Sequence, residues 1–228
     1  MSEIILMSDP RVAAVPVHEC GEPLLDLRAD SPFLVDGRKQ DDSGSYFLLR
    51  KGVVERLKRA EEALPAGLRL MIVEGHRSPA LQRRYFEGYA AELRAGRPEW
   101  SEDEVHSKAS RYVSPPDIAP HTAGAAVDLT LAGPDGRELD LGTPMNASPE
   151  DSAGACYTGA ENISDLARDH RETLKAALVA AGLVNYPTEW WHWSFGDRYW
   201  ALTVGADCAY YGPLDKVPGQ SIGRANDA

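Results

Sequence analysis

The segment 119–131 constrains the fold of this chain most strongly, because it joins a histidine to a strand-like run through a flexible turn. His121 is followed by small residues that include Gly124, and residues 127–131 then alternate apolar and polar side chains. Alternation with a period of two is typical of a strand. We therefore expect a strand that carries Asp128 on the face opposite its apolar neighbours, where a loop histidine and a strand carboxylate can converge.

A second segment, Glu189-Trp-Trp-His-Trp-Ser-Phe195, is rich in aromatic residues and also predicts a strand. A regular strand would point Glu189 and His192 to opposite faces. Both side chains can reach one point only if Glu189 lies at the entry of the strand, beside the turn at residues 186–188. This is the geometry that we expect.

Together these segments supply two imidazoles and a carboxylate, His121, Asp128 and His192, which is a ligand set for a catalytic zinc. Glu189 would stand beside it as a general base. A single histidine or aspartate is more often a hydrogen-bonded structural residue. His121 and His192 differ from the other histidines because each has a carboxylate nearby in the sequence. Asp128 follows His121, and Glu189 precedes His192 by three residues. The chain is therefore predicted to be a zinc hydrolase.

A third segment adds an arginine. The apolar run 68–73 predicts a strand, and a helical pattern begins after it with Ser78 as the N-cap and Pro79 as the first residue. Arg77 thus lies on a strand-to-helix turn, where its guanidinium could stabilise an oxyanion. Taken alone, it would be interpreted as a surface or salt-bridged arginine.

The three motifs Gly75-His-Arg-Ser-Pro79, His121-x6-Asp128-Leu-Thr-Leu and Glu189-Trp-Trp-His192 occur in this order and resemble those of the VanX-type D-alanyl-D-alanine dipeptidases. These are zinc D,D-peptidases of the M15 type, and the resemblance covers about residues 68–200. It implies one Zn²⁺ per chain and hydrolysis of a D-Ala-D-Ala dipeptide to two D-alanines. It also implies the roles of the matching residues: zinc ligands at His121, Asp128 and His192, the base at Glu189, and a carbonyl-polarising arginine at Arg77.

Two positions depart from the family pattern. Ala119 stands where the family tends to have serine, and Pro149 aligns with the aspartate that receives the ammonium of the substrate. Because Glu150 and Asp151 follow directly, we expect one of them to take that role.

Three alternatives remain open at this point: a D,D-carboxypeptidase, a dipeptidase with another side-chain preference, and a non-catalytic zinc module that recognises cell-wall peptides or a protein partner. The last needs neither Glu189 nor Arg77, because a structural zinc site usually fills its fourth position with a ligand.

Length and composition agree with a soluble enzyme. The net charge of −11 argues against nucleic acid as a partner. No stretch approaches the length of a membrane span, and the N-terminus lacks the pattern of a signal peptide. Three cysteines argue against a disulfide framework or a cysteine zinc site. We expect a cytoplasmic protein; no feature predicts its oligomeric state.

The chain is expected to form one domain over residues 1–212, with 1–45 wrapping the core as loops and one or two edge strands. Residues 213–228 are expected to be a loose tail. Helices are predicted at 53–64, 79–94, 99–111 and 163–181, and a closing strand at 198–204. This order favours an α+β fold, with a mainly antiparallel sheet flanked by helices. The zinc would lie in a cleft across the sheet, and the long connection 132–161 would form part of its rim.

Overall fold

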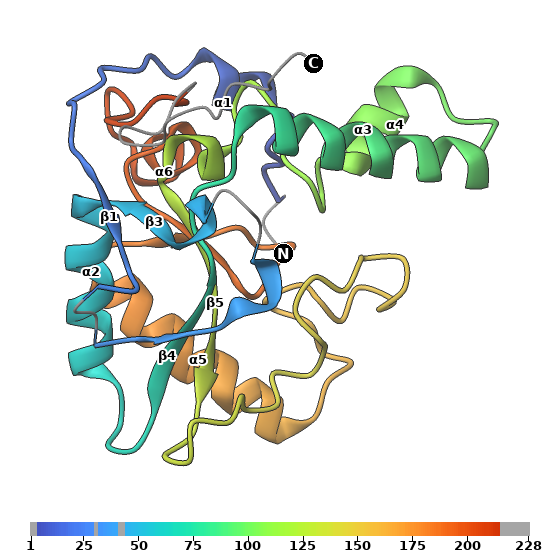
Figure 1. Ribbon diagram of the computed structural model, residues 1–228. Coiled ribbons are helices and arrows are strands. Elements are labelled where there is room, and N and C mark those ends of the chain that lie inside the picture. The colour runs from blue at the N-terminus through green and yellow to red at the C-terminus, as the bar shows by residue number, and fades with distance from the viewer. Residues whose placement is uncertain (1–3, 30–31, 41–43, 215–228) are drawn as a thin grey trace, which may run out of the picture.

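The computed structural model describes residues 4–29, 32–40 and 44–214 (Figure 1). The predicted tail therefore lies, from residue 215 onward, outside the described residues. The helices are α1 (Pro10–Ala14), α2 (Lys51–Ala63), α3 (Pro79–Gly96), α4 (Glu102–Ala109), α5 (Asp165–Ala180) and α6 (Arg198–Val204). The strands are β1 (Leu24–Asp26), β2 (Leu34–Val35), β3 (Leu48–Arg50), β4 (Arg69–Glu74), β5 (Ala126–Ala132), β6 (Val184–Asn185) and β7 (His192–Ser194). Short 3-10 helices are η1 (Gly37–Lys39), η2 (Ser45–Phe47) and η3 (Pro120–Ala123).

The central sheet has the strand order β2-β4-β5-β7-β6. Strand β2 pairs with β4 in parallel, and the other pairs in this sheet are antiparallel. Strands β1 and β3 form a separate antiparallel pair. The predicted α+β class with a mainly antiparallel sheet is confirmed. The N-terminal segment contributes β2, which lies at one edge of this sheet.

Helices α2 and α5 pack together and help to cover the sheet. The apolar side chains of β5 at Val127, Leu129 and Leu131 join Leu57 of α2 and Leu174 of α5 in the main hydrophobic core. Asp128 lies between these apolar positions along β5, so it belongs to the opposite face of the sheet. The predicted alternation of this strand is therefore confirmed.

Helices α3 and α4 form a pair that extends away from the sheet (Figure 1). Helix α3 begins as predicted, with the Ser78 side chain accepting a hydrogen bond from Leu81 N and Pro79 in the first turn. Helix α4 is shorter than the predicted helix, because Ser101 and Glu104 form a capping box that fixes its start. The pair has its own small core around Leu93 and Val105.

The predicted closing strand at 198–204 is wrong, because this segment is helix α6. The Asp197 side chain accepts hydrogen bonds from Tyr199 N and Trp200 N, which caps the helix, and Gly205 ends it with φ 72°. The aromatic and β-branched composition of the segment favours a strand locally. The carboxylate cap and the terminal glycine outweigh that preference.

Two further features are the state of the cysteines and the length of the helices. The three cysteines are free, at positions 20, 156 and 208. Within the described ranges, every helix is too short or too polar to cross a membrane.

Candidate metal centre and catalytic site

The site begins as a row of side chains across three neighbouring strands. Glu74 of β4 pairs with Asp128 of β5, and Asp128 pairs with His192 of β7. Directly opposed residues on adjacent strands project from the same face of a sheet. The pairing of the sheet, which joins residues far apart in the sequence, therefore brings a second carboxylate and a histidine to either side of Asp128.

His121 reaches the same point from η3, immediately before β5. Gly124 ends η3 with φ 64°, a backbone conformation that favours glycine. A Cβ atom at this position would lie 2.5 Å from the Leu24 Cδ2 atom, so a side chain would also clash. The small residues after His121 thus allow the tight turn that returns this histidine toward the strand.

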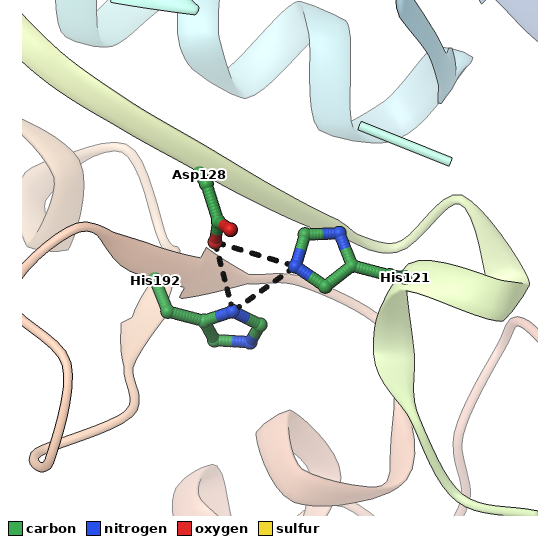
Figure 2. Close-up of side chains that lie close together, drawn as sticks. All are labelled: His121, Asp128 and His192. Carbon is green, nitrogen blue, oxygen red and sulfur yellow. Dashed lines mark hydrogen bonds and ion pairs between the residues drawn. The ribbon is translucent and has the colours of Figure 1, made fainter. Parts of the chain in front are cut away.

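Three ligand atoms converge in the resulting cluster (Figure 2). His121 Nε2 lies 3.2 Å from His192 Nδ1 and 3.3 Å from Asp128 Oδ1, and His192 Nδ1 lies 3.0 Å from the same oxygen. Ligand atoms around a tetrahedral zinc, with bonds of about 2.0–2.1 Å, are separated by roughly 3.3 Å. The spacing of the three atoms therefore fits a metal ion with little rearrangement.

The hydrogen bond of the His121 ring supports the same assignment. His121 Nδ1 lies 2.7 Å from the Gly75 carbonyl oxygen, so in the neutral ring Nδ1–H donates and Nε2 presents a lone pair to the cluster. That lone pair faces the carboxylate of Asp128, an arrangement that a cation between them stabilises. Gly75 is closely packed, because a Cβ atom there would lie 2.6 Å from the Leu48 carbonyl oxygen.

Burial and neighbouring groups shift the pKa values of Asp128 and His192 toward their metal-binding forms. Burial disfavours the charged form of Asp128, but the neighbouring His121 and His192 hold the pKa of this carboxyl well below its ordinary value. Burial lowers the pKa of His192. A deprotonated carboxylate and a neutral imidazole are the forms that bind a metal.

Glu189 lies outside the three-atom cluster but next to it. It lies beside the turn at residues 187–188, and its Oε2 atom is 3.7 Å from His192 Nδ1. Strand β7 begins only at His192, so it is shorter than the predicted strand over 189–195. Burial and, second, the charge of Asp128 raise the pKa of Glu189 well above its ordinary value. A buried carboxyl with a raised pKa beside a metal site suits a group that accepts and returns a proton.

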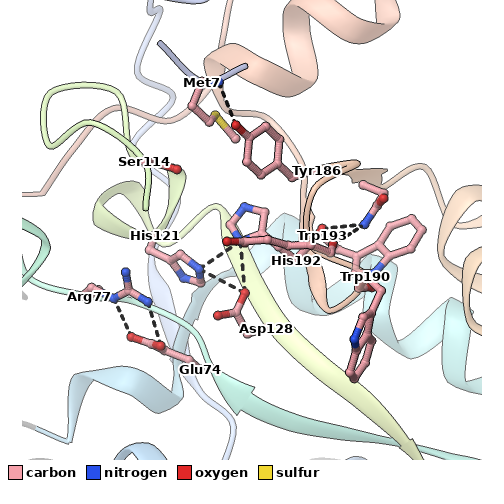
Figure 3. Close-up of polar contacts among 12 residues, drawn as sticks. Met7, Glu74, Arg77, Ser114, His121, Asp128, Tyr186, Trp190, His192 and Trp193 are labelled. Atoms are coloured by element: carbon pink, nitrogen blue, oxygen red, sulfur yellow. Dashed lines mark hydrogen bonds and ion pairs between the residues drawn. The ribbon is translucent and has the colours of Figure 1, made fainter. Parts of the chain in front are cut away.

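Arg77 is held by a bidentate ion pair with Glu74 (Figure 3). Its Nε and Nη2 atoms donate to the two oxygens of Glu74 at 2.6 and 2.7 Å, and Nη1 donates to Gln82 Oε1 at 2.9 Å. Burial would raise the pKa of Glu74, but the charge and hydrogen bonds of Arg77 keep it below the ordinary value. Arginine has five N–H donors. Two therefore remain for another acceptor.

These groups share one cavity of about 420 Å³. The ligands His121, Asp128 and His192, together with Glu189 and Arg77, line it. Its other walls include Lys39, Gln82, Tyr85, Tyr89, Tyr112 and Asn146.

The two acidic residues expected to receive the substrate's ammonium are placed differently. Glu150 accepts a hydrogen bond from Tyr89 and forms an ion pair with Arg111. Asp151 accepts a hydrogen bond from Ser148 Oγ at 2.7 Å. The structure brings neither carboxylate into the lining of the cavity.

Glu74 is the main site residue without a role in the sequence interpretation. The only signal for it was its position three residues before Arg77, at the end of the strand-like run. Its pairing opposite Asp128 depends on the sheet register, which a single short motif does not reveal.

A metal-binding cluster beside a buried carboxyl and an arginine with free donors describes a metal-dependent hydrolase. The pattern of the M15 peptidase family, described as D-ala-D-ala dipeptidase, matches residues 20–206. The chain belongs to this family and is a metallopeptidase. A purely structural zinc module is thereby disfavoured.

Two relatives of this chain are named as D-alanyl-D-alanine dipeptidases. A D-alanyl-D-alanine dipeptidase of Synechocystis sp. (strain ATCC 27184 / PCC 6803 / Kazusa) is 27% identical over 237 residues, covering 89% of this chain and 96% of the relative. A D-alanyl-D-alanine dipeptidase of Escherichia coli (strain K12) is 32% identical over 72 residues, covering 32% of this chain and 35% of the relative. Among solved structures, VanYB in complex with D-Alanine-D-Alanine is similar with a TM-score of 0.44 and 16% identity, covering 88% of this chain and 96% of that one.

Proposed function

We propose that this chain is a zinc-dependent dipeptidase that hydrolyses D-Ala-D-Ala to two D-alanines. The observation that carries the proposal is the convergence of three ligand atoms, 3.0–3.3 Å apart, from His121, Asp128 and His192. Glu189 and Arg77 face the same cavity. Family membership supplies the substrate class, because two relatives are named D-alanyl-D-alanine dipeptidases.

The proposed roles follow from the contacts. When bound, Zn²⁺ would lower the pKa of water and polarise a carbonyl group. Glu189 takes a proton from the attacking water and returns it to the leaving amine, a role that suits its raised pKa. Arg77 donates its remaining N–H groups to the carbonyl oxygen as negative charge develops there. Its ion pair with Glu74 fixes the guanidinium before substrate binds.

A second candidate, a D,D-carboxypeptidase, is favoured by one observation. The expected ammonium partners Glu150 and Asp151 lie outside the cavity lining, and a substrate that makes no contact with them could have a blocked or extended amino terminus. The prediction that one of them receives the ammonium stays a prediction. The expected cytoplasmic location belongs to the dipeptidase proposal, in which the substrate is a free dipeptide.

Metal analysis of the purified protein tests the centre. We expect about one zinc per chain, lost in His121→Ala because the Nε2 ligand is removed. His18→Ala is the matched control and should keep its zinc, because His18 is exposed and lies outside the cluster. Full zinc retention in both His121→Ala and His192→Ala would refute the ligand assignment.

The purified wild-type protein is also used to identify the preferred substrate. D-Ala-D-Ala, its N-acetylated form, L,L-dipeptides and a longer peptide ending in D-Ala-D-Ala are compared by kcat/KM. The dipeptidase proposal expects the free D,D-dipeptide to be preferred. Equal or faster cleavage of the longer peptide would establish the carboxypeptidase instead.

A further inference from the structure

Two cationic side chains line the cavity, and their charges are compensated to different degrees. Arg77 is buried, and the carboxylate of Glu74 pairs with it through both oxygens. Lys39, at the end of η1, is the second cation. Its Nζ atom is 3.9 Å from Glu74 Oε2, too far for a hydrogen bond, and that oxygen already accepts from Arg77. Glu74 is therefore hydrogen-bonded to Arg77 and only loosely paired with Lys39.

The position of Lys39 is set by the wall on which it lies. Its Nζ atom is 5.7 Å from the centre of the Tyr85 ring, and Arg77 Cζ is 4.9 Å from the same ring centre. Both cations therefore contact Glu74 and Tyr85 and are neighbours along one side of the cavity. The side chain of Lys39 is 26% exposed, and it lines the same cavity as Glu189.

We propose that Lys39 binds the C-terminal carboxylate of the substrate. The inference rests on the proposed peptidase function and adds the group that recognises a free carboxyl terminus. In a dipeptide the carboxylate carbon is three bonds from the scissile carbonyl carbon. A substrate whose carbonyl oxygen accepts from Arg77 can therefore present its carboxylate to the adjacent ammonium. An ammonium–carboxylate hydrogen bond is charge-assisted and would give the Lys39 ammonium a closely bound acceptor.

The test compares free D-Ala-D-Ala with its C-terminal carboxamide, which keeps the scissile bond and removes the negative charge. With zinc-loaded full-length protein, we expect Lys39→Met to lower kcat/KM for the free acid by about 10–100-fold, the usual weight of a hydrogen bond between charged groups. Hydrolysis of the carboxamide should change less than about twofold. Lys39→Arg should retain most of the preference for the acid. A similar fall for both substrates, or none for either, would overturn the assignment.

Lys51→Met is the matched control. Lys51 is an exposed lysine of α2 whose Nζ lies 3.6 Å from Glu55, and it is not part of the cavity lining. This variant should leave hydrolysis of both substrates unchanged. A loss of acid preference in Lys51→Met equal to that in Lys39→Met would show a general effect of net charge and would also overturn the proposal.

Calorimetric binding of the free acid and the carboxamide separates this inference from the proposed function. If D-Ala-D-Ala binds with a Lys39-dependent preference for the acid but is not cleaved, the carboxylate site stands and the proposed function fails. If the dipeptide is cleaved and Lys39→Met affects acid and carboxamide alike, the function stands and the assignment fails. If neither ligand binds, both fail.

Discussion

The cavity has two regions that are built in different ways. The metal floor consists of His121, Asp128 and His192. The rim consists of Tyr89, Tyr112 and Asn146, which line the cavity, together with the ion pair of Arg111 and Glu150, which contacts Tyr89 outside the lining. The side chains of the floor are buried, and their backbones belong to η3 and to two paired strands. The rim is held by side-chain contacts that helix α3 and the turn after α4 make with the long connection after β5. We infer that the floor fixes the chemistry and the rim affects which peptides enter.

The conformation of the rim supports this division. Asn146 lines the cavity with φ 63°, a left-handed conformation that asparagine adopts more readily than most residues. Its carbonyl oxygen accepts a hydrogen bond from Tyr112 Oη at 2.7 Å, and the Tyr112 ring packs edge-on against Tyr89. Variants of Glu189 and Arg77, which line the cavity beside the floor, should therefore change the rate for every substrate. Variants of the rim should mainly change selectivity.

The largest of these effects is expected at Glu189. Glu189→Gln should lower kcat by about 10²–10⁴-fold while zinc stays bound, because the side chain is assigned as a base and not as a ligand. Since burial raises the pKa of Glu189, the wild-type rate should fall as the pH drops and this carboxyl becomes protonated. Steady-state kinetics and metal analysis provide the measurement. Glu87→Gln, an exposed change on α3, is the control. Loss of zinc from Glu189→Gln would instead make Glu189 a ligand.

The next largest effect is expected at Arg77. Arg77→Ala should lower kcat by roughly 10²–10³-fold with a smaller change in KM, since a donor to the developing oxyanion acts mainly in the transition state. Kinetics with D-Ala-D-Ala separate the two parameters. An unchanged kcat with a large rise in KM would assign Arg77 to ground-state binding of the substrate.

The ion pair with Glu74 requires a control for folding. Arg77→Ala leaves a buried carboxylate without its partner, a change that typically costs about 3–5 kcal/mol of stability. Adding Glu74→Gln removes the unpaired charge, so the melting temperature should recover. If kcat recovers with it, the loss of activity came from unfolding and not from catalysis.

The two regions also differ in how far the sequence predicts them. Asp128 follows from the alternation of its own strand, and the placement of Glu189 follows from the parity of the strand that contains His192. Both arguments use neighbours within a few residues. The position of Glu74 beside Asp128 depends on the pairing of β4 with β5. The register of these strands, which are more than fifty residues apart, cannot be inferred from neighbouring residues.

Contacts of the rim join residues that are far apart in the sequence, so a pattern among a few neighbouring residues does not predict them. Tyr89 and Glu150 are 61 residues apart, and nothing in either segment indicates the other. The position of Glu150 next to Pro149 predicted a role in ammonium binding only through alignment with the family. Helix α6 shows the same limit in the fold, because its composition favours a strand while the Asp197 cap decides the outcome.

The smallest effect is expected at Glu150, and it distinguishes the two interpretations of that residue. If Glu150 holds the rim, Glu150→Gln should change kcat/KM for D-Ala-D-Ala by less than about tenfold, because a partly exposed ion pair contributes on the order of 1 kcal/mol or less. Arg111→Gln should then produce the same change, since it breaks the same contact. If Glu150 receives the ammonium, its substitution should cost several kcal/mol of binding. The loss would be confined to substrates with a free amino terminus, and Arg111→Gln would not reproduce it. Kinetics of both variants with D-Ala-D-Ala and its N-acetylated form therefore decide whether the rim selects substrate by shape or by charge.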